Sequence, residues 1–83
     1  MYTWFYNAAV NHDLKLVLDH QTVYKVKHDS YTSKLSNLEI DFSSAIPIKI
    51  ITANEDYFKA KAGHNKVPGC IWTVDSNGNF EAL

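Results

Sequence analysis

The sequence contains no arginine. Its eight basic residues are all lysines, and they stand against nine acidic residues for a formal charge of −1. Without a guanidinium group the chain cannot make the planar, two-pronged contacts that arginine forms with phosphates and guanine bases. A net charge near zero also provides no strongly basic surface, on which phosphate binding depends. Both absences argue against nucleic acid as the first-choice partner.

Cysteine, glycine and proline are scarce as well. Cys70 is the single cysteine, which excludes an internal disulfide and a multi-thiolate metal site. Small secreted domains usually carry several disulfides, so we expect a reducing compartment, the cytoplasm. The three glycines stand apart at positions 63, 69 and 78 and form no phosphate-binding loop.

Long hydrophobic runs are missing too. Even the most apolar stretch, residues 46–51, is interrupted by Pro47 and Lys49, so the sequence predicts no membrane span. Apolar residues make up 46% of the 83 residues and charged residues 20%, which is typical of globular proteins. The charges are spread evenly along the chain. We therefore predict a single globular domain over residues 1–83.

Alternation of apolar and polar residues is the main pattern that is present, and it predicts three antiparallel hairpins. Their strands pair residues 14–18 with 22–28, 38–42 with 46–50, and 70–75 with 80–83. Pro47 cannot donate a hydrogen bond, so its strand is expected at an edge. Asn77-Gly78 is expected to form a type I′ turn in the third hairpin. The aromatic residues 2–6 predict a further, N-terminal strand.

One short helix is expected near residues 54–62. Asn54 can cap its start, Glu55 lies in its first turn, and Gly63 can end it. These elements together predict a β-rich α+β domain. Its curled sheet or small barrel would be crossed by the one helix.

The histidines are the strongest candidates for chemistry. The first predicted hairpin would bring His12 and Asp13 close to His28 and Asp29, and such a group could bind a transition metal or transfer protons. However, aspartate is common where strands end, and no metal-ligand spacing accompanies these residues. We read them as structural, and we read Cys70 as a small buried hydrophobe. The sequence predicts no catalytic residue, metal site or cofactor.

The aromatic residues favour a binding surface. Five tyrosines, four phenylalanines and two tryptophans are many for a core of this size, and tyrosine and tryptophan often anchor protein interfaces. We predict partner contacts at Tyr2, Trp4 and Tyr6, with Lys25 and Lys27 as a second patch. A packed core with ordinary exposed tyrosines explains the same composition equally well. An exposed strand edge would also allow a homodimer.

These observations predict a non-enzymatic protein-interaction module in the cytoplasm. Its lysine-, asparagine- and isoleucine-rich composition is typical of AT-rich genes, which are common in bacteriophages and in some low-GC bacteria. We predict a phage-type accessory or inhibitor protein that blocks a host protein. The alternative is a small β-barrel that binds single-stranded nucleic acid. In that case the N-terminal aromatics would share a sheet face with Lys15, Lys25 and Lys27. A hydrolase built on the histidines is the third hypothesis.

Overall fold

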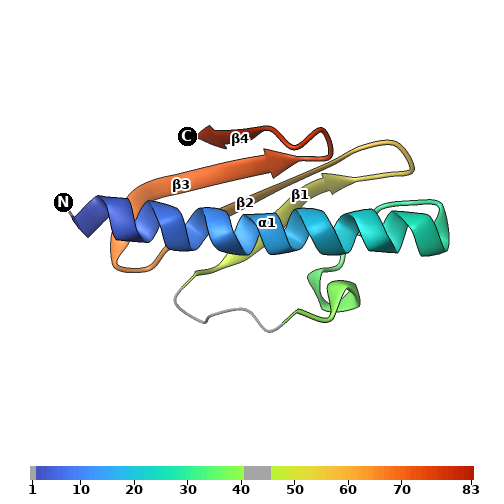
Figure 1. Cartoon of the computed structure of the whole chain (residues 1–83), viewed down its shortest axis with the longest axis horizontal. Coiled ribbons are helices and arrows are strands. Elements are labelled where there is room, and N and C mark those ends of the chain that lie inside the picture. The colour runs from blue at the N-terminus through green and yellow to red at the C-terminus, as the bar shows by residue number, and fades with distance from the viewer. Residues whose placement is uncertain (1, 41–45) are drawn as a thin grey trace.

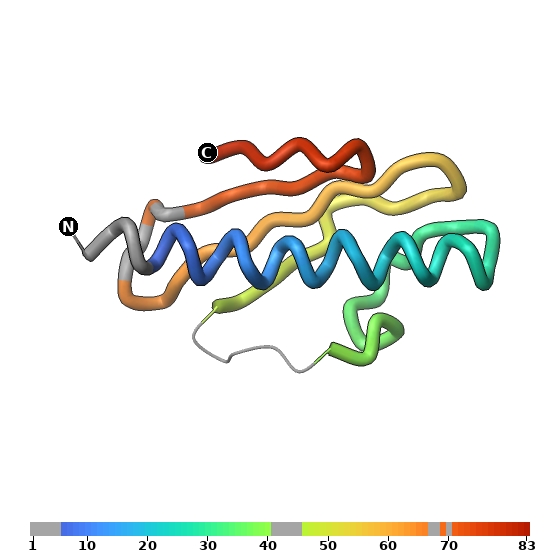
Figure 2. The backbone as a smooth tube through the Cα atoms, in the orientation of Figure 1, coloured from blue at the N-terminus to red at the C-terminus, as the bar shows by residue number. Residues whose placement is uncertain are grey.

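One long helix packs against one face of an antiparallel sheet (Figure 1). The computed structural model describes the backbone of residues 2–40 and 46–83, and the side chains of these residues except 2–5, 67, 68 and 70. The chain runs through the helix, a connecting segment and then four strands in sequence order (Figure 2). The prediction of a small α+β domain is therefore confirmed.

Helix α1 spans Tyr2–His28 and sets the length of the molecule. A helix of 27 residues is about 40 Å long, and the longest dimension of the molecule is 41 Å. Its buried side chains Val10, Leu14, Val17 and Gln21 recur every three or four residues, so they form one stripe toward the sheet. Asp29 follows in the left-handed conformation, with φ of 58°, and ends the helix.

The N-terminal strand and the first hairpin predicted from the sequence are wrong, because residues 2–28 are helical. Leu14 and Leu18 fit a helical stripe as well as a strand face, so alternation alone could not separate the two structures. The expected loop at residues 20–22 has no glycine, proline or asparagine to favour a turn. With no turn signal to interrupt it, the segment continues as a helix that buries its apolar stripe.

The sheet is a four-stranded antiparallel meander in the order β1-β2-β3-β4. Its strands are β1 (Ile48–Ala53), β2 (Phe58–His64), β3 (Val67–Asp75) and β4 (Phe80–Ala82). In the part of the chain that the structure describes, β1 and β4 are edges and do not pair with each other, so the sheet is open rather than a closed barrel. Strand β1, which follows Pro47, lies at an edge as predicted.

The helix predicted near residues 54–62 is wrong, because most of this segment is strand β2. Asn54 does cap backbone N–H groups, as expected, but it does so in the β1–β2 turn. Its Oδ1 accepts hydrogen bonds from the backbone N–H groups of Asp56 (2.8 Å) and Tyr57 (2.9 Å). An asparagine that accepts bonds two and three residues ahead can close a turn as readily as it begins a helix.

The C-terminal hairpin is confirmed, although its turn differs from the predicted type. Val74 lies opposite Phe80, and Trp72 lies opposite Ala82. The turn begins at Asp75, whose carbonyl oxygen accepts from the Gly78 N–H at 3.0 Å. Gly78 has a positive φ of 82° whereas Asn77 has not, which is a type I turn followed by a left-handed glycine.

The second predicted hairpin is only partly formed. Its later strand exists within β1, which pairs with β2. Residues 38–40 are not part of a strand, and residues 41 and 42 lie outside the described residues. Leu38 instead ends the 3₁₀ helix η1 (Leu35–Leu38), and the expected loop at residues 43–45 lies outside the described residues. Leu38 and Ile46 both reach the core, so these apolar residues are buried by a different route.

Gln21 holds the segment after α1 against the helix. Its side chain is fully buried, donates from Nε2 to the Thr32 carbonyl oxygen (2.7 Å) and accepts at Oε1 from the Thr32 N–H (2.9 Å). One amide therefore satisfies both backbone groups of a buried residue. His20 lies one position earlier, and its Nδ1 is 3.1 Å from the Leu38 carbonyl oxygen.

The core lies between α1 and the face of the sheet that α1 covers. It is formed by Val10, Leu14, Val17, Leu38, Ile46, Phe58, Ala60, Ala62 and Val74. Alanines at two positions of β2 let the helix approach the centre of the sheet closely. Among the described residues, no helix is both long enough and apolar enough to cross a membrane.

Candidate functional site

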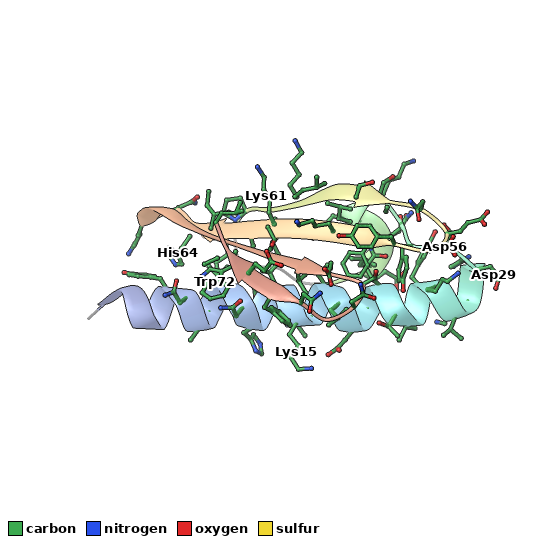
Figure 3. The ribbon with its side chains drawn as sticks, turned by 90° about the horizontal axis from the view of Figure 1, so that it is seen from above. Lys15, Asp29, Asp56, Lys61, His64 and Trp72 are labelled. Carbon is green, nitrogen blue, oxygen red and sulfur yellow. The ribbon has the colours of Figure 1, made fainter. Side chains whose placement is uncertain are left out.

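The face of the sheet that points away from α1 has no secondary structure element packed on it in the described part of the chain; we call it the open face. Side chains alternate along each strand, so the residues between the buried positions of β2 belong to it. Figure 3 shows Lys61 pointing away from the helix, whereas Trp72 and His64 lie on the helix side. The strand register arranges the residues of the open face in rows across the sheet.

Two lysines stand directly opposite each other in the central row. Lys49 of β1 pairs with Lys61 of β2, and the row continues to Thr73 of β3 and Glu81 of β4. Side chains at directly opposed positions are about 5 Å apart at Cβ, and like charges there destabilise a sheet. Neither lysine forms an ion pair with any residue that the structure describes. The described part of the fold thus places two positive charges side by side, with no ion pair to either.

The neighbouring row is apolar. Gly63 of β2 lies opposite Ile71 of β3, and Leu83 donates its backbone N–H to the Ile71 carbonyl oxygen at 2.8 Å. On the other side, Pro47 accepts a hydrogen bond from the Gly63 N–H at 3.4 Å. This apolar row (Pro47, Gly63, Ile71 and Leu83) runs beside the two lysines, and Leu83 is 73% exposed.

A hollow of about 380 Å³ lies where the two rows meet. Gly63 has no side chain to fill this place, and Lys49, Lys61, Ile71 and Gly69 stand around it. Its lining combines residues of the open face with Ile48, Ala62 and His64, whose side chains lie on the helix side. Its volume is at the lower end of the range for ligand sites, about 300–1,000 Å³. The combination offers apolar contact next to two positive charges.

The other end of the open face carries negative charge. Asp75 lies opposite Lys59. Burial alone would raise the pKa of Asp75, but hydrogen bonds from the backbone and side chain of Asn79 and from the Asn77 N–H, together with the Lys59 charge, lower it. Lys59 is therefore balanced by an anion on its own face, unlike Lys49 and Lys61.

The N-terminal residues predicted to bind a partner lie on α1 and not on a strand. Tyr2 and Trp4 belong to its first turns, and their side chains are outside the described residues. Tyr6 is half-buried and its ring packs on His64 of β2 at 4.4 Å between centroids. Trp72 donates from Nε1 to Asn7 Oδ1 at 3.0 Å. Tyr6 and Trp72 therefore help to attach the start of the helix to the sheet.

Lys25 and Lys27, the second predicted patch, lie in the last turn of α1. Lys25 donates to the Asp29 carbonyl oxygen at 3.1 Å, which satisfies the helix end. Lys27 is exposed and lines a hollow of about 180 Å³ with His20, Tyr24 and Glu39 among others. Along the helix axis Lys25 is about 29 Å and Lys27 about 32 Å from Tyr6, so the two predicted patches are far apart.

The histidine group considered from the sequence is not formed. His12 and His28 are separated by about 24 Å along α1, because a helix replaces the hairpin that would have joined them. His28 stacks on Tyr24 at 4.2 Å between ring centroids. Within the described residues, no three histidine, cysteine, aspartate or glutamate side chains are close enough to hold a metal ion.

Sequence reasoning missed Lys49 and Lys61 as a pair. The signal was present in residues 58–62, where Phe58, Ala60 and Ala62 alternate with lysines as a half-buried strand does. Only a strand there brings Lys61 opposite Lys49. Comparison with known proteins supplies no further guide, since no protein-family model and no curated protein sequence matches the chain.

Proposed function

We propose that the chain is a non-enzymatic protein-interaction domain that binds its partner with the open face of the sheet. The observation that carries this proposal is the directly opposed pair of Lys49 and Lys61, neither of which forms an ion pair among the described residues, beside an apolar hollow. Opposed like charges cost about 0.2–1 kcal/mol of stability. A partner that places an anion between them would remove this cost and gain apolar contact in the hollow.

Nucleic acid fits this face less well. Proteins that bind single strands stack bases on aromatic side chains, but the described residues of the open face include no aromatic residue. Phe58, Trp72 and Phe80 all lie on the side of the sheet that packs against the helix. The aromatic and basic sheet face of the alternative hypothesis is wrong, because its residues lie on α1.

An inhibitory or accessory role, as predicted from the sequence, would follow if the surface covered on the partner is itself functional. The single cysteine keeps a reducing compartment, the cytoplasm, as the proposed location. Both statements extend the proposal and depend on the identity of the partner.

Affinity capture from a lysate of the source organism tests the proposal. Three baits are compared: the wild type, the double variant Lys49→Glu/Lys61→Glu, and the control Lys27→Glu at the far end of α1. We expect a protein that the wild type and the control retain equally and that the double variant retains at least tenfold less. Equal capture by all three baits, or loss with Lys27→Glu alone, would contradict binding by the open face.

A further inference from the structure

The spacing between the apolar row and the two lysines suggests what kind of sequence the open face recognises. Residues of one face are two positions apart along a strand, which is a separation of about 7 Å. Gly63 and Lys61 have this relation on β2, and Ile71 and Thr73 have it on β3. An extended peptide has the same repeat, so its residues i and i+2 point to the same side and match the distance between the rows.

The hollow takes the apolar member of such a pair. Gly63 leaves the space, Ile71 provides an apolar wall, and the stems of Lys49 and Lys61 line the side toward the next row. Gly69 contributes backbone from a left-handed conformation, with φ of 92°, at the bulge of β3. A volume of about 380 Å³ accommodates a large aliphatic or aromatic side chain.

The lysine pair takes the charged member. A carboxylate placed between two ammonium groups accepts hydrogen bonds from both, and such charge-assisted bonds are among the stronger polar contacts. The described residues supply no carboxylate to Lys49 or Lys61 from within the chain, although Asp75 balances the neighbouring Lys59. A partner's carboxylate between the two lysines would offset the repulsion between them.

We infer that the open face recognises an extended segment of a partner protein in which an apolar residue is followed, two positions later, by aspartate or glutamate. The apolar side chain enters the hollow at Gly63, and the carboxylate lies between Lys49 and Lys61. This inference rests on the proposed function, because it names the partner chemistry of the same surface.

Peptide titrations followed by the amide resonances of the ¹⁵N-labelled protein test the inference. The probe is acetyl-Thr-Leu-Thr-Glu-Thr-amide, added to about 5 mM because a short peptide binds weakly. Three control peptides replace the glutamate by glutamine, replace the leucine by serine, or place leucine and glutamate next to each other. Adjacent residues of an extended peptide point to opposite sides, so the last control keeps the composition and removes the match.

We expect shifts at Lys49, Lys61, Gly63 and Ile71 with the probe, and at least fivefold weaker binding for each control peptide. Lys49→Glu/Lys61→Glu should weaken probe binding by the same factor, and Lys27→Glu should leave it within twofold. Equal binding of the matched and adjacent spacings, shifts centred elsewhere, or no shifts would overturn the inference. A single-stranded oligothymidylate that shifts these amides when the peptide does not would replace the peptide by nucleic acid.

The two tests fail separately. If the capture experiment depends on Lys49 and Lys61 but the peptides show no spacing dependence, the open face binds protein and the inferred motif is wrong. If capture does not depend on these lysines, the proposed function itself is wrong.

Discussion

The two faces of the sheet differ in burial and in charge along the same strands. On the covered face, Phe58, Ala60 and Ala62 of β2 are almost fully buried against α1. On the open face, the residues between them are lysines, and Lys61 stands opposite a second lysine, Lys49, with no ion pair to either among the described residues. Burial and packing explain these three residues of the covered face. The open face contains an arrangement that stability does not favour, and this difference is why we assign binding to it.

The largest difference in stability is expected between substitutions at two neighbouring residues of β2, one on each face of the sheet. Phe58→Ala removes a fully buried ring that packs on Tyr31 at 5.1 Å, and should lower the free energy of unfolding by about 3–5 kcal/mol. Lys59→Ala, one residue later on the open face, should change it by at most about 0.5 kcal/mol. Urea denaturation of both variants measures the two losses in the free energy of unfolding. Similar losses would contradict the assignment of the two faces.

The covered layer also depends on a polar clamp. Gln21→Leu keeps the volume but leaves the buried N–H and carbonyl groups of Thr32 without their partner. We expect a loss of about 2–3 kcal/mol, because unsatisfied buried groups keep their full desolvation cost. Thr22→Ala is the control, since that exposed hydroxyl bonds only to the Leu18 carbonyl within the helix. A loss no greater than that of the control would show that the clamp is dispensable.

Asp13 is a buried carboxylate on the covered side, and its effect on stability should depend on pH. It is 9% exposed, and its Oδ2 is buried with no hydrogen-bond partner among the residues that the structure describes. Burial raises the pKa of Asp13 from its ordinary value of 3.8, and nearby His12 opposes this by lowering it. The folded state therefore binds the proton more tightly than the unfolded state does. Its stability should fall as the pH rises from about 4 through the raised pKa, and then stay level.

Asp13→Asn removes this charge and should raise the free energy of unfolding at pH 7 by about 1 kcal/mol. The fall in stability above pH 4 should become smaller by the same amount. Urea denaturation of wild type and variant between pH 4 and 7 measures both quantities. Parallel pH profiles for the two proteins would show that Asp13 is not the group responsible.

The smallest expected change in stability is the one whose sign shows whether the two lysines face each other. Lys49→Glu converts the opposed lysines into an oppositely charged pair and should stabilise the sheet by about 0.2–1 kcal/mol. The same change should weaken partner binding, since it removes one of the two positive charges. Thermal unfolding at low and at high salt checks the stability gain, which should shrink as salt screens the pair. A variant that is less stable than the wild type would mean that the two lysines do not face each other.

The sequence allowed some of this to be predicted, where local signals decide the structure. The C-terminal hairpin was predicted because Asn77 and Gly78 mark a turn between two short apolar runs, and Pro47 correctly indicated an edge. The helix was missed because Gln21 and Asp13 interrupt its buried stripe, while leucines two residues apart imitate a strand. Burial of a glutamine becomes favourable only when Thr32 supplies both of its partners, which is a tertiary effect.

The candidate site was harder to predict from the sequence than the fold was. It depends on which lysine lies opposite which, and this follows from the register of β1 and β2 and from a bulge between Ile50 and Thr52. The helix predicted near residues 54–62 left β2 out of the sheet, so the register between β1 and β2 could not be derived from the sequence. The predicted contacts Tyr2, Trp4 and Tyr6 followed from a strand that the structure replaces with the first turns of α1.

Footprinting of the lysines is the most direct test of partner binding by the open face. All eight basic residues are lysines, and they are distributed over α1, the connecting segments and the open face, so one acetylating reagent reports on each region. The acetylation rate of every lysine is measured by mass spectrometry with and without the captured partner. We predict strong protection of Lys49 and Lys61 and unchanged rates at Lys15 and Lys27. Protection at Lys15 or Lys27 with Lys49 and Lys61 still reactive would contradict it.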